Sequence, residues 1–272
     1  MEILKDAGTF ELVHWPTNIA QIGEVARTCY QSFDRSSPEN DVKLVENLLK
    51  RKHMPMIEFD DLIVRFNNVC RGFTHELVRH RLCSFAQEST RYVDESDFKV
   101  VVPPHRDEHA CVNIAIPTGE KVNGISRYTS LNVSLADWFL MNEDMYRELR
   151  KAGWLPEDAR QTLPIAIKSQ IVCKANLREW RHIFAMRTSK FAHWEIRRVM
   201  CNLLEEVKMG IPTIFNDFEE AGYDKNGLRY FRMLDPVKEG IRNGLIELYN
   251  MIEVPGNEAA FAIMDQMKEL VA

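Results

Sequence analysis

The spacing of apolar residues along the chain predicts more helices than strands. In 18–33 an apolar residue recurs every three or four positions, the period of an amphipathic helix, and the same period runs through 191–209. Ser37-Pro38 predicts the start of another helix, because proline fits the first turn of a helix. Further helices are predicted over 74–81, 120–151, 176–187 and 236–252.

Three shorter runs are typical of strands, at 57–69, 98–102 and 165–173. The strands do not alternate regularly with the helices, so the pattern favours the α+β class over α/β. The chain contains no Pro/Gly/Ser-rich linker, internal repeat or low-complexity tract. We therefore expect one domain over 1–272.

Composition agrees with a globular protein that has its own core. A chain of 272 residues can bury roughly 70–75% of its unfolded surface without disulfides. The six cysteines include no CxxC pair, which predicts free, mostly buried thiols and argues against structural zinc. The first ten residues carry charges where a signal peptide would be apolar, and no apolar run reaches 18 residues. We expect a cytoplasmic protein without a membrane span.

The distribution of glycine and arginine indicates which ligands the chain can bind, and by which groups. The 12 glycines form neither GxGxxG nor a P-loop, so any nucleotide must be bound mainly by side chains. Nine of the 21 arginines fall within 71–91 and 178–198, although the formal net charge is −5. Arginine recognises phosphates and carboxylates with paired N–H groups. Alternatively, these arginines could form ion pairs on the surfaces of helices, without binding a ligand.

The triplet Arg79-His80-Arg81 favours the anion-binding interpretation. Three adjacent side chains that are cationic or can become so repel one another unless an anion lies nearby. The following polar run, 87–91, ends in a guanidinium and could surround a nucleotide, although it could also be a polar loop.

The triplet is followed by seven residues and then Ser89, and this pattern resembles the signature of the flavin-dependent thymidylate synthases. Three further stretches match that family in the expected order over roughly 20–215: His53 with Glu58, Arg160 before Leu163-Pro164, and NLREWRHIFAMR (176–187) followed by HWEIR (193–197). The resemblance implies a mixed sheet flanked by helices and a homotetramer with shared active sites. It also implies conversion of dUMP to dTMP, with methylenetetrahydrofolate as carbon donor, reduced FAD as hydride source and NADPH as the reductant of the flavin.

The resemblance also assigns residues. Flavin contacts are expected from His53, Arg79, His80, Arg81, Gln87, Asn176, Arg178 and His182. Contacts with dUMP are expected from Glu76, Arg79, Gln87, Glu88, Ser89, Thr90, Arg91, Arg160 and Arg187. Arg187 corresponds to the arginine that activates the uracil ring, and is the expected catalytic residue. Arg178 and His182 share a helix face at i, i+4, whereas Arg187 is about half a turn out of phase and should face another ligand.

Other interpretations remain. The same arginines could serve a nucleic-acid- or anion-binding protein, but the acidic net charge and the lack of a broad basic stripe argue against nucleic acid. His105 and His109 are spaced like a metal pair, yet Pro103-Pro104 predicts a loop there, and we expect no metal. A packing role is expected for His193 and Trp194.

Overall fold

The computed structural model describes residues 1–16 and 18–234, and its centre is a four-stranded antiparallel sheet. The strand order is β2 (Thr9–His14), β3 (Asp61–Cys70), β8 (Lys168–Asn176) and β4 (Ser84–Gln87). In β3 every second residue from Leu62 to Phe66 is buried, and in the register of β8 Val64 lies opposite Cys173. The predicted strand 57–69 starts later than expected because 54–59 form the 3-10 helix η3 (Met54–Phe59).

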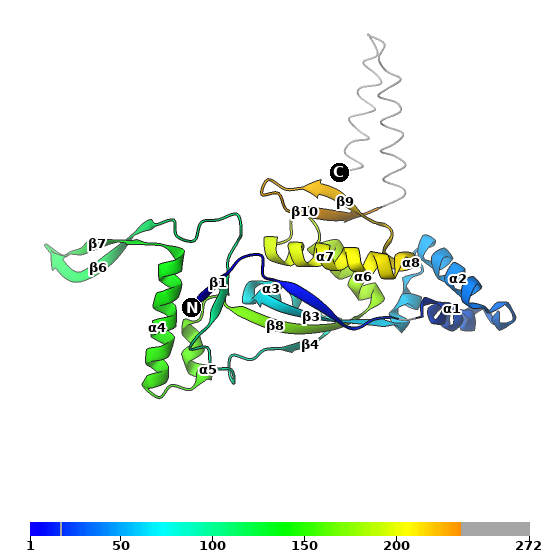
Figure 1. Ribbon diagram of the computed structural model, residues 1–272, viewed down its shortest axis with the longest axis horizontal. Helices are drawn as coiled ribbons and strands as arrows, with labels where there is room; N and C mark the ends of the chain where they lie inside the picture. The colour runs from blue at the N-terminus through cyan, green and yellow to red at the C-terminus, as the bar shows by residue number, and fades with distance from the viewer. Residues whose placement is uncertain (17, 235–272) are drawn as a thin grey trace, which may run out of the picture.

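Two long helices cover one face of this sheet, as Figure 1 shows. They are α6 (Leu177–Arg187) and α7 (Trp194–Gly210), close to the predicted 176–187 and 191–209. Their apolar faces join the inward side chains of β3 and β8 in one core. Trp180 ties α6 to the sheet, since its indole N–H donates to the Leu62 carbonyl at 2.9 Å. The short helix α3 (Arg71–Leu77) follows β3 directly and ends before the triplet, whereas the predicted helix 74–81 included it.

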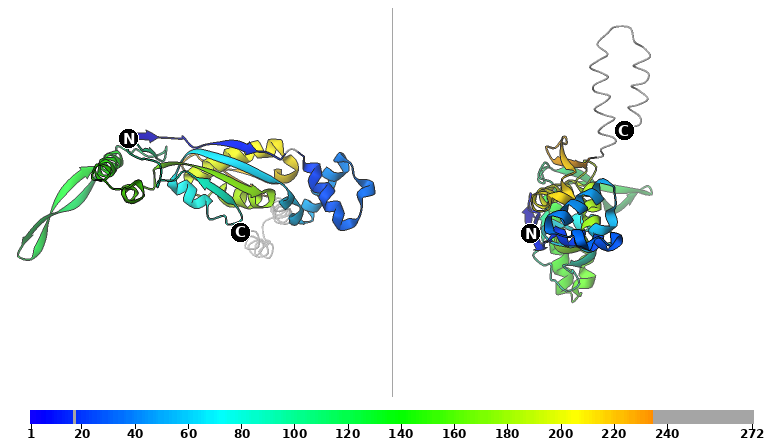
Figure 2. Two further views of the ribbon diagram at one scale, coloured as in Figure 1. Left: turned by 90° about the horizontal axis from the view of Figure 1, so that it is seen from below. Right: turned by 90° about the vertical axis from the view of Figure 1, so that its right-hand side faces the viewer.

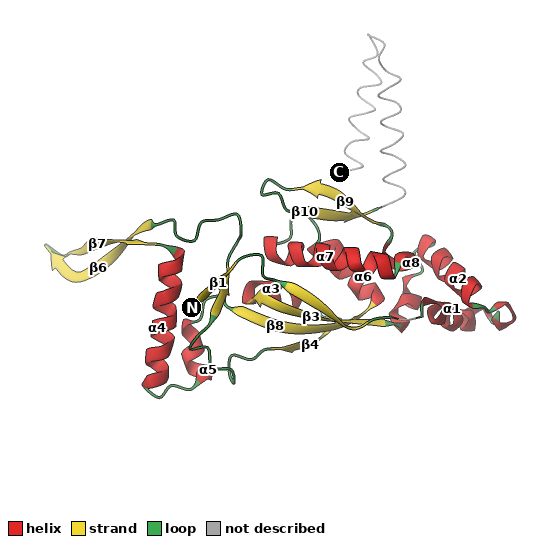
Figure 3. Ribbon diagram, viewed as in Figure 1, coloured by secondary structure: helices red, strands yellow, loops and turns green. Residues whose placement is uncertain are grey.

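A helical group lies at one end of the sheet (Figure 3). Its members are α1 (Ile19–Arg27), α2 (Pro38–Lys50), α8 (Pro212–Phe215) and the 3-10 turns η1 (Thr28–Tyr30) and η2 (Phe33–Arg35). Helix α2 begins at Pro38 as predicted, and Ser37 caps it by accepting from the Asn40 N–H at 3.3 Å. The helix predicted over 18–33 is shorter, and Gln31 takes a left-handed conformation with φ of 48°.

At the opposite end of the sheet, the structure differs from the helix predicted over 120–151. Residues 120–133 are not helical: β6 (Val112–Val122) and β7 (Ile125–Val133) form an antiparallel hairpin that projects from the body (Figure 2). Asn123 and Gly124 both have positive φ, the conformation that two-residue hairpin turns require. The predicted helix begins only at α4 (Leu135–Lys151), where Ser134 and Asp137 form a capping box.

The remaining elements complete the described chain. β1 (Glu2–Leu4) pairs in parallel with β5 (Lys99–Val101), and the short helices α5 (Pro156–Ala159) and η4 (Arg160–Thr162) precede β8. β9 (Phe218–Tyr223) and β10 (Arg229–Met233) form a hairpin that reaches the end of α6 through a hydrogen bond from the Phe231 N–H to the Thr188 carbonyl.

The α+β class is confirmed by this architecture. The predicted helix 236–252 lies outside the described residues. All six cysteines are free thiols, and three of them are buried. Within 1–16 and 18–234, no helix is long and apolar enough to cross a membrane.

Candidate active site

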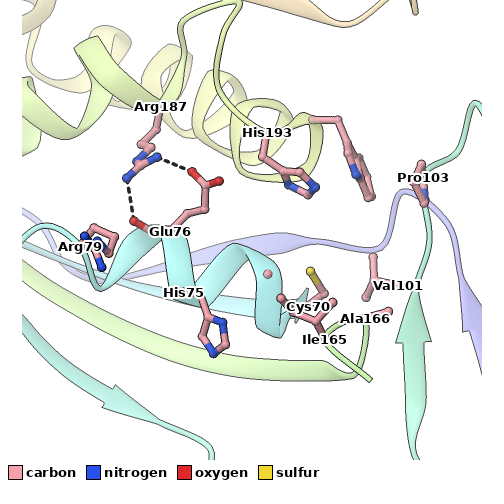
Figure 4. Close-up of a pocket in the computed structure, with 12 residues that line it drawn as sticks. Cys70, His75, Glu76, Arg79, Val101, Pro103, Ile165, Ala166, Arg187 and His193 are labelled. Atoms are coloured by element: carbon pink, nitrogen blue, oxygen red, sulfur yellow. Dashed lines mark hydrogen bonds and ion pairs between the residues drawn. The ribbon is translucent and has the colours of Figure 1, made fainter. Parts of the chain in front are cut away.

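A pocket of about 550 Å³ lies between α3, the end of α6 and the start of α7 (Figure 4). One side is charged and carries Glu76, Arg79 and Arg187. The other side is mostly apolar and is formed by Val101, Pro103, Ile165, Ala166 and Trp194. A volume of this size suits a small-molecule ligand. The pocket therefore offers both a charged end and a surface for a planar ring.

Arg187, the last residue of α6, is held from two directions. Its Nε–H donates to Nε2 of His80 at 2.9 Å. One terminal nitrogen donates to the Glu76 backbone carbonyl at 2.8 Å, and the other forms an ion pair with the Glu76 carboxylate (Figure 4). A guanidinium has five N–H donors, so two have no hydrogen-bond partner among the described residues and remain for a ligand.

In the triplet, the side chain of His80 is buried, whereas those of Arg79 and Arg81 are exposed. His80 is only 4% exposed, and burial together with the nearby charges of Arg187 and His182 lowers its pKa to about 4. The imidazole is therefore neutral at neutral pH, which relieves part of the expected repulsion. Arg79 and Arg81 are exposed, and their side chains form no ion pair or hydrogen bond with any described residue.

The second group of predicted ligands, 87–91 with Arg160, lies outside this pocket and contacts α3 through Gln87 and Glu88. The Gln87 amide donates to Thr74 Oγ1 at 2.8 Å and to Ser169 Oγ at 3.3 Å. Further contacts include Glu88 with Lys168 at 3.2 Å, Arg91 with Glu157 at 3.0 Å, Arg160 with Thr90 at 3.5 Å, and Ser89 Oγ with the Arg91 N–H at 3.3 Å. Within one chain none of these residues lines the pocket of Glu76, Arg79 and Arg187.

Glu95 is a buried acid that the sequence did not single out. Burial and the charge of Glu88 raise its pKa to about 7, while Lys168 and Arg71 act in the opposite direction. It lies beside the polar run 87–91 and so contributes to the electrostatics there. A lone glutamate in a charged segment carries no sequence signal of burial.

Four of the predicted flavin residues, Asn176, Arg178, His182 and His53, lie on α6 or beside it. Asn176 caps this helix, since its Oδ1 accepts from the Glu179 N–H at 2.9 Å. Arg178 is exposed and pairs with Glu58 of η3 at 2.6 Å. His53 is exposed at the start of η3, and η3 packs against α6. His182 is also exposed, and its ring lies 5.5 Å from that of His80.

His80, Glu179 and His182 also place possible metal ligands close together. Their ligand atoms all lie within 4.8 Å of one another, the one such trio found in the described part of the chain. His105 and His109 do not come together with a third ligand: the His105 ring contacts Trp194, and His109 lies 3.8 Å from Glu108.

His193 and Trp194, for which a packing role is expected, lie at the pocket. Both line the pocket, and the His193 side chain lies across from Glu76 in Figure 4. The rings of His193 and Trp194 are 5.4 Å apart. They stand at the start of α7, close after Arg187, and this proximity along the chain was the signal that could have found them. His75 and Cys70 also line the pocket and were missed.

Comparison with known proteins bears on this site. The family model described as "Thymidylate synthase complementing protein" (Thy1) matches residues 12–213. The chain is similar to flavin-dependent thymidylate synthases of Mycobacterium avium (32% identity, covering 77% of this chain and 84% of that protein) and Corynebacterium glutamicum (31% identity, 76% and 84%).

Two solved structures share the fold. One is the UMP/dUMP methylase PolB from Streptomyces cacaoi bound with 5-Br dUMP (TM-score 0.60, 20% identity, 79% of this chain and 96% of that chain). The other is the flavin-dependent thymidylate synthase ThyX from Helicobacter pylori complexed with FAD and dUMP (TM-score 0.58, 19% identity, 77% and 98%). The match to the family model and the identity to its curated members together show that the chain belongs to the flavin-dependent thymidylate synthase family.

Proposed function

We propose that this chain converts dUMP to dTMP, with methylenetetrahydrofolate as carbon donor, reduced FAD as hydride source and NADPH as the reductant of the flavin. The observation that carries the proposal is the fixed guanidinium of Arg187 at the charged end of the pocket. Family membership supports the same reaction. The binding of nucleic acid by the same arginines is not favoured by either observation.

Arg187 suits the activation of uracil. The C5 carbon of the base becomes nucleophilic when negative charge is stabilised on the N3/O2/O4 side of the ring. The two N–H groups of Arg187 that have no described partner can supply that stabilisation. Because Glu76 and His80 hold the guanidinium before a ligand binds, no reorganisation is needed, and such preorganised donors are worth about 3–4 kcal/mol.

The residues around the triplet fit FAD. Arg79 and Arg81 are exposed cations whose side chains have no counter-ion among the described residues, and Arg178 stands exposed at the start of α6. They can bind the pyrophosphate without a glycine-rich loop. When bound, FAD would supply the hydride chemistry, while His53, His182 and Asn176 would help to bind and orient it.

We further propose a homotetramer whose active sites are shared between subunits. In one chain, Glu76, Arg79 and Arg187 line the pocket, whereas 87–91 and Arg160 do not. If both groups bind one dUMP, the second group must come from another subunit. Arg91 and Arg160 would then supply cations for the phosphate. We keep the cytoplasm as the expected location, where NADPH and folate are available.

The experiment is an assay of the purified chain with FAD, NADPH, methylenetetrahydrofolate and dUMP, with dTMP measured by mass spectrometry. We expect dTMP only when all four are present, and NADPH consumption without dTMP when folate is omitted. A flavin-loaded, dUMP-binding chain that makes no dTMP would contradict the proposal. A nucleic-acid-binding protein would instead show an affinity for nucleic acid that falls steeply with salt.

A further inference from the structure

Glu179 forms only half of the capping box that its spacing from Asn176 suggests. Its backbone N–H donates to Asn176 Oδ1 at 2.9 Å, as a capped helix requires. Its carboxylate turns toward the triplet instead, with one oxygen 3.5 Å from Nδ1 of His80. The residue is 7% exposed, and burial raises its pKa. A buried carboxylate costs free energy unless it has a partner, and the cap does not supply one.

The contact between His80 and Arg187 determines where the imidazole proton lies. Arginine is always a donor, so Nε2 of His80 must offer a lone pair to the Nε–H of Arg187 at 2.9 Å. A neutral imidazole carries one N–H, which must then be on Nδ1. Nδ1 is the nitrogen that faces Glu179. The geometry of the two contacts is thus consistent with one tautomer only.

We propose that Glu179 is a positioning residue, which keeps the proton of His80 on Nδ1 so that Nε2 can hold Arg187 in place. The proposal deepens the proposed function and rests on it, since it assigns Glu179 to the orientation of the arginine that activates uracil. No contact between Glu179 and substrate is implied.

The surroundings of the pair supply no substitute for Glu179. The charged or titratable groups that face the pair are Arg187 and His182 on α6 and Cys173 on β8. Arg187 is a donor only, and the Cys173 thiol is kept protonated because a hydrogen bond to Cys83 and burial raise its pKa. The His182 ring packs edge-on against that of His80, with ring centroids 5.5 Å apart, and forms no hydrogen bond with it. Without Glu179, the proton of His80 is free to move to Nε2. An Nε2–H group would then meet the Nε–H of Arg187, donor against donor, and the contact would be lost.

The first test observes the proton directly. The full-length chain is labelled with 15N-histidine, and the signal of His80, among eight histidines, is identified by its absence in His80→Gln. We expect wild type and Glu179→Gln to carry the proton on Nδ1, because the amide oxygen can still accept it. Glu179→Ala should show the Nε2–H form or an exchanging mixture.

Glu143→Ala is the matched control. Glu143 is another buried carboxylate, 2% exposed, which pairs with the chain's N-terminal ammonium at 2.7 Å and with Arg147 at 3.4 Å on α4. Its loss should lower stability without moving the proton of His80. A wild-type His80 protonated on Nε2 would overturn the proposal, as would one zinc ion per purified chain bound at Nδ1.

The second test is a double-mutant cycle on turnover at saturating dUMP. Alone, Glu179→Ala should lower kcat about tenfold to a hundredfold, with little change in the KM for dUMP, and Glu179→Gln should stay within about threefold of wild type. In the His80→Gln background, which has no Nδ1–H, Glu179→Ala should cost less than about twofold. An equal loss in both backgrounds would show a merely structural role and overturn the proposal.

The NMR result is obtained without substrate. It therefore tests the role of Glu179 even if the wild-type chain makes no dTMP, an outcome that would instead contradict the proposed function.

Discussion

The side chains of Arg187 and His80 meet at 2.9 Å although the two residues lie 107 positions apart in the sequence. The contact joins the end of α6 to the turn that follows α3. Glu76, on α3 itself, binds the same guanidinium through its carboxylate and its backbone carbonyl. The charge at the pocket is therefore oriented before any ligand arrives, which is the condition under which a fixed charge stabilises a transition state most.

We expect FAD to be bound noncovalently and to depend on Arg81. Heat-denatured protein should release the chromophore to the supernatant. Arg81→Ala should weaken flavin binding about tenfold to a hundredfold, because it removes an exposed cation that has no described protein partner. Flavin fluorescence during titration measures this. Arg65→Ala, which removes an arginine paired with Glu11 on the sheet, should bind FAD normally. A colourless chain that cannot be reconstituted would refute the flavin assignment.

Cys70 lines the pocket but should not act as a nucleophile. Its Sγ donates to Glu195 at 2.7 Å, and burial together with the Glu195 charge raises the pKa of the thiol. The thiolate is the reactive form, so a thiol kept protonated is inert. Cys70→Ala should keep kcat within about threefold of wild type after correction for lost stability. Trapping of a covalent dUMP adduct on Cys70 would contradict this expectation.

The elements with the strongest helical period could be predicted from the sequence, and the hairpin could not. Helices α2, α6 and α7 have apolar stripes of helical period and clear starting signals, and each is found close to its predicted position. The prediction over 120–151 failed only for residues 120–133, where the Asn123-Gly124 turn forms a hairpin and outweighs helical spacing in a segment that buries almost nothing. Helix α4 lies within the rest of the predicted range.

The motif residues of the site could be predicted from the sequence, but the contacts between them could not. The spacing of the triplet and Ser89 carries the family resemblance, whereas the partners of Arg187 come from distant segments that fold together only in three dimensions. Glu179 shows the same limit: a local rule pairs it with the helix cap, and tertiary structure turns its carboxylate toward His80. Deviations from local rules of this kind concentrate at functional sites.

Two buried groups should give opposite contributions to the pH dependence of stability. Burial lowers the pKa of His80 to about 4 from 6.5, so the unfolded chain binds the extra proton between these values and stability rises with pH. Burial raises the pKa of Glu95 from 4.5 to about 7, so the folded chain holds the extra proton and stability falls as pH rises. Between about pH 4.5 and 6.5 the two contributions oppose each other.

Glu95→Gln should expose the contribution of His80. Relative to wild type, the free energy of unfolding of this variant should increase with pH by up to about 1.4 kcal/mol per unit between pH 5 and 6.5. His80→Gln should show the opposite slope. Urea denaturation at the two pH values measures both. Variants whose stability runs parallel to that of wild type across this range would show that the two pKa values are not shifted.

Shared sites predict rescue between two inactive variants. Arg79→Ala and Arg91→Ala should each be nearly inactive, because Arg79 lines the pocket and Arg91 belongs to the second group of predicted ligands, 87–91 with Arg160. In a mixed pair of subunits, one site collects both defects and its symmetry mate collects neither. Co-expression with random mixing should restore about a quarter of wild-type activity by this two-fold arithmetic. Differentially tagged, well-mixed oligomers that show only the sum of the parental activities would rule out sharing.

The most direct measurement separates the two halves of the reaction in Arg187→Ala. Under anaerobic conditions, the reduction of bound flavin by NADPH and the yield of dTMP after addition of dUMP and methylenetetrahydrofolate are followed in the same sample. We predict that flavin stays bound and is reduced as in wild type, while the rate of dTMP formation falls about a hundredfold to a thousandfold. Loss of the flavin from Arg187→Ala, with dUMP affinity and dTMP formation unchanged once FAD is restored, would contradict the assignment of Arg187 to the uracil ring.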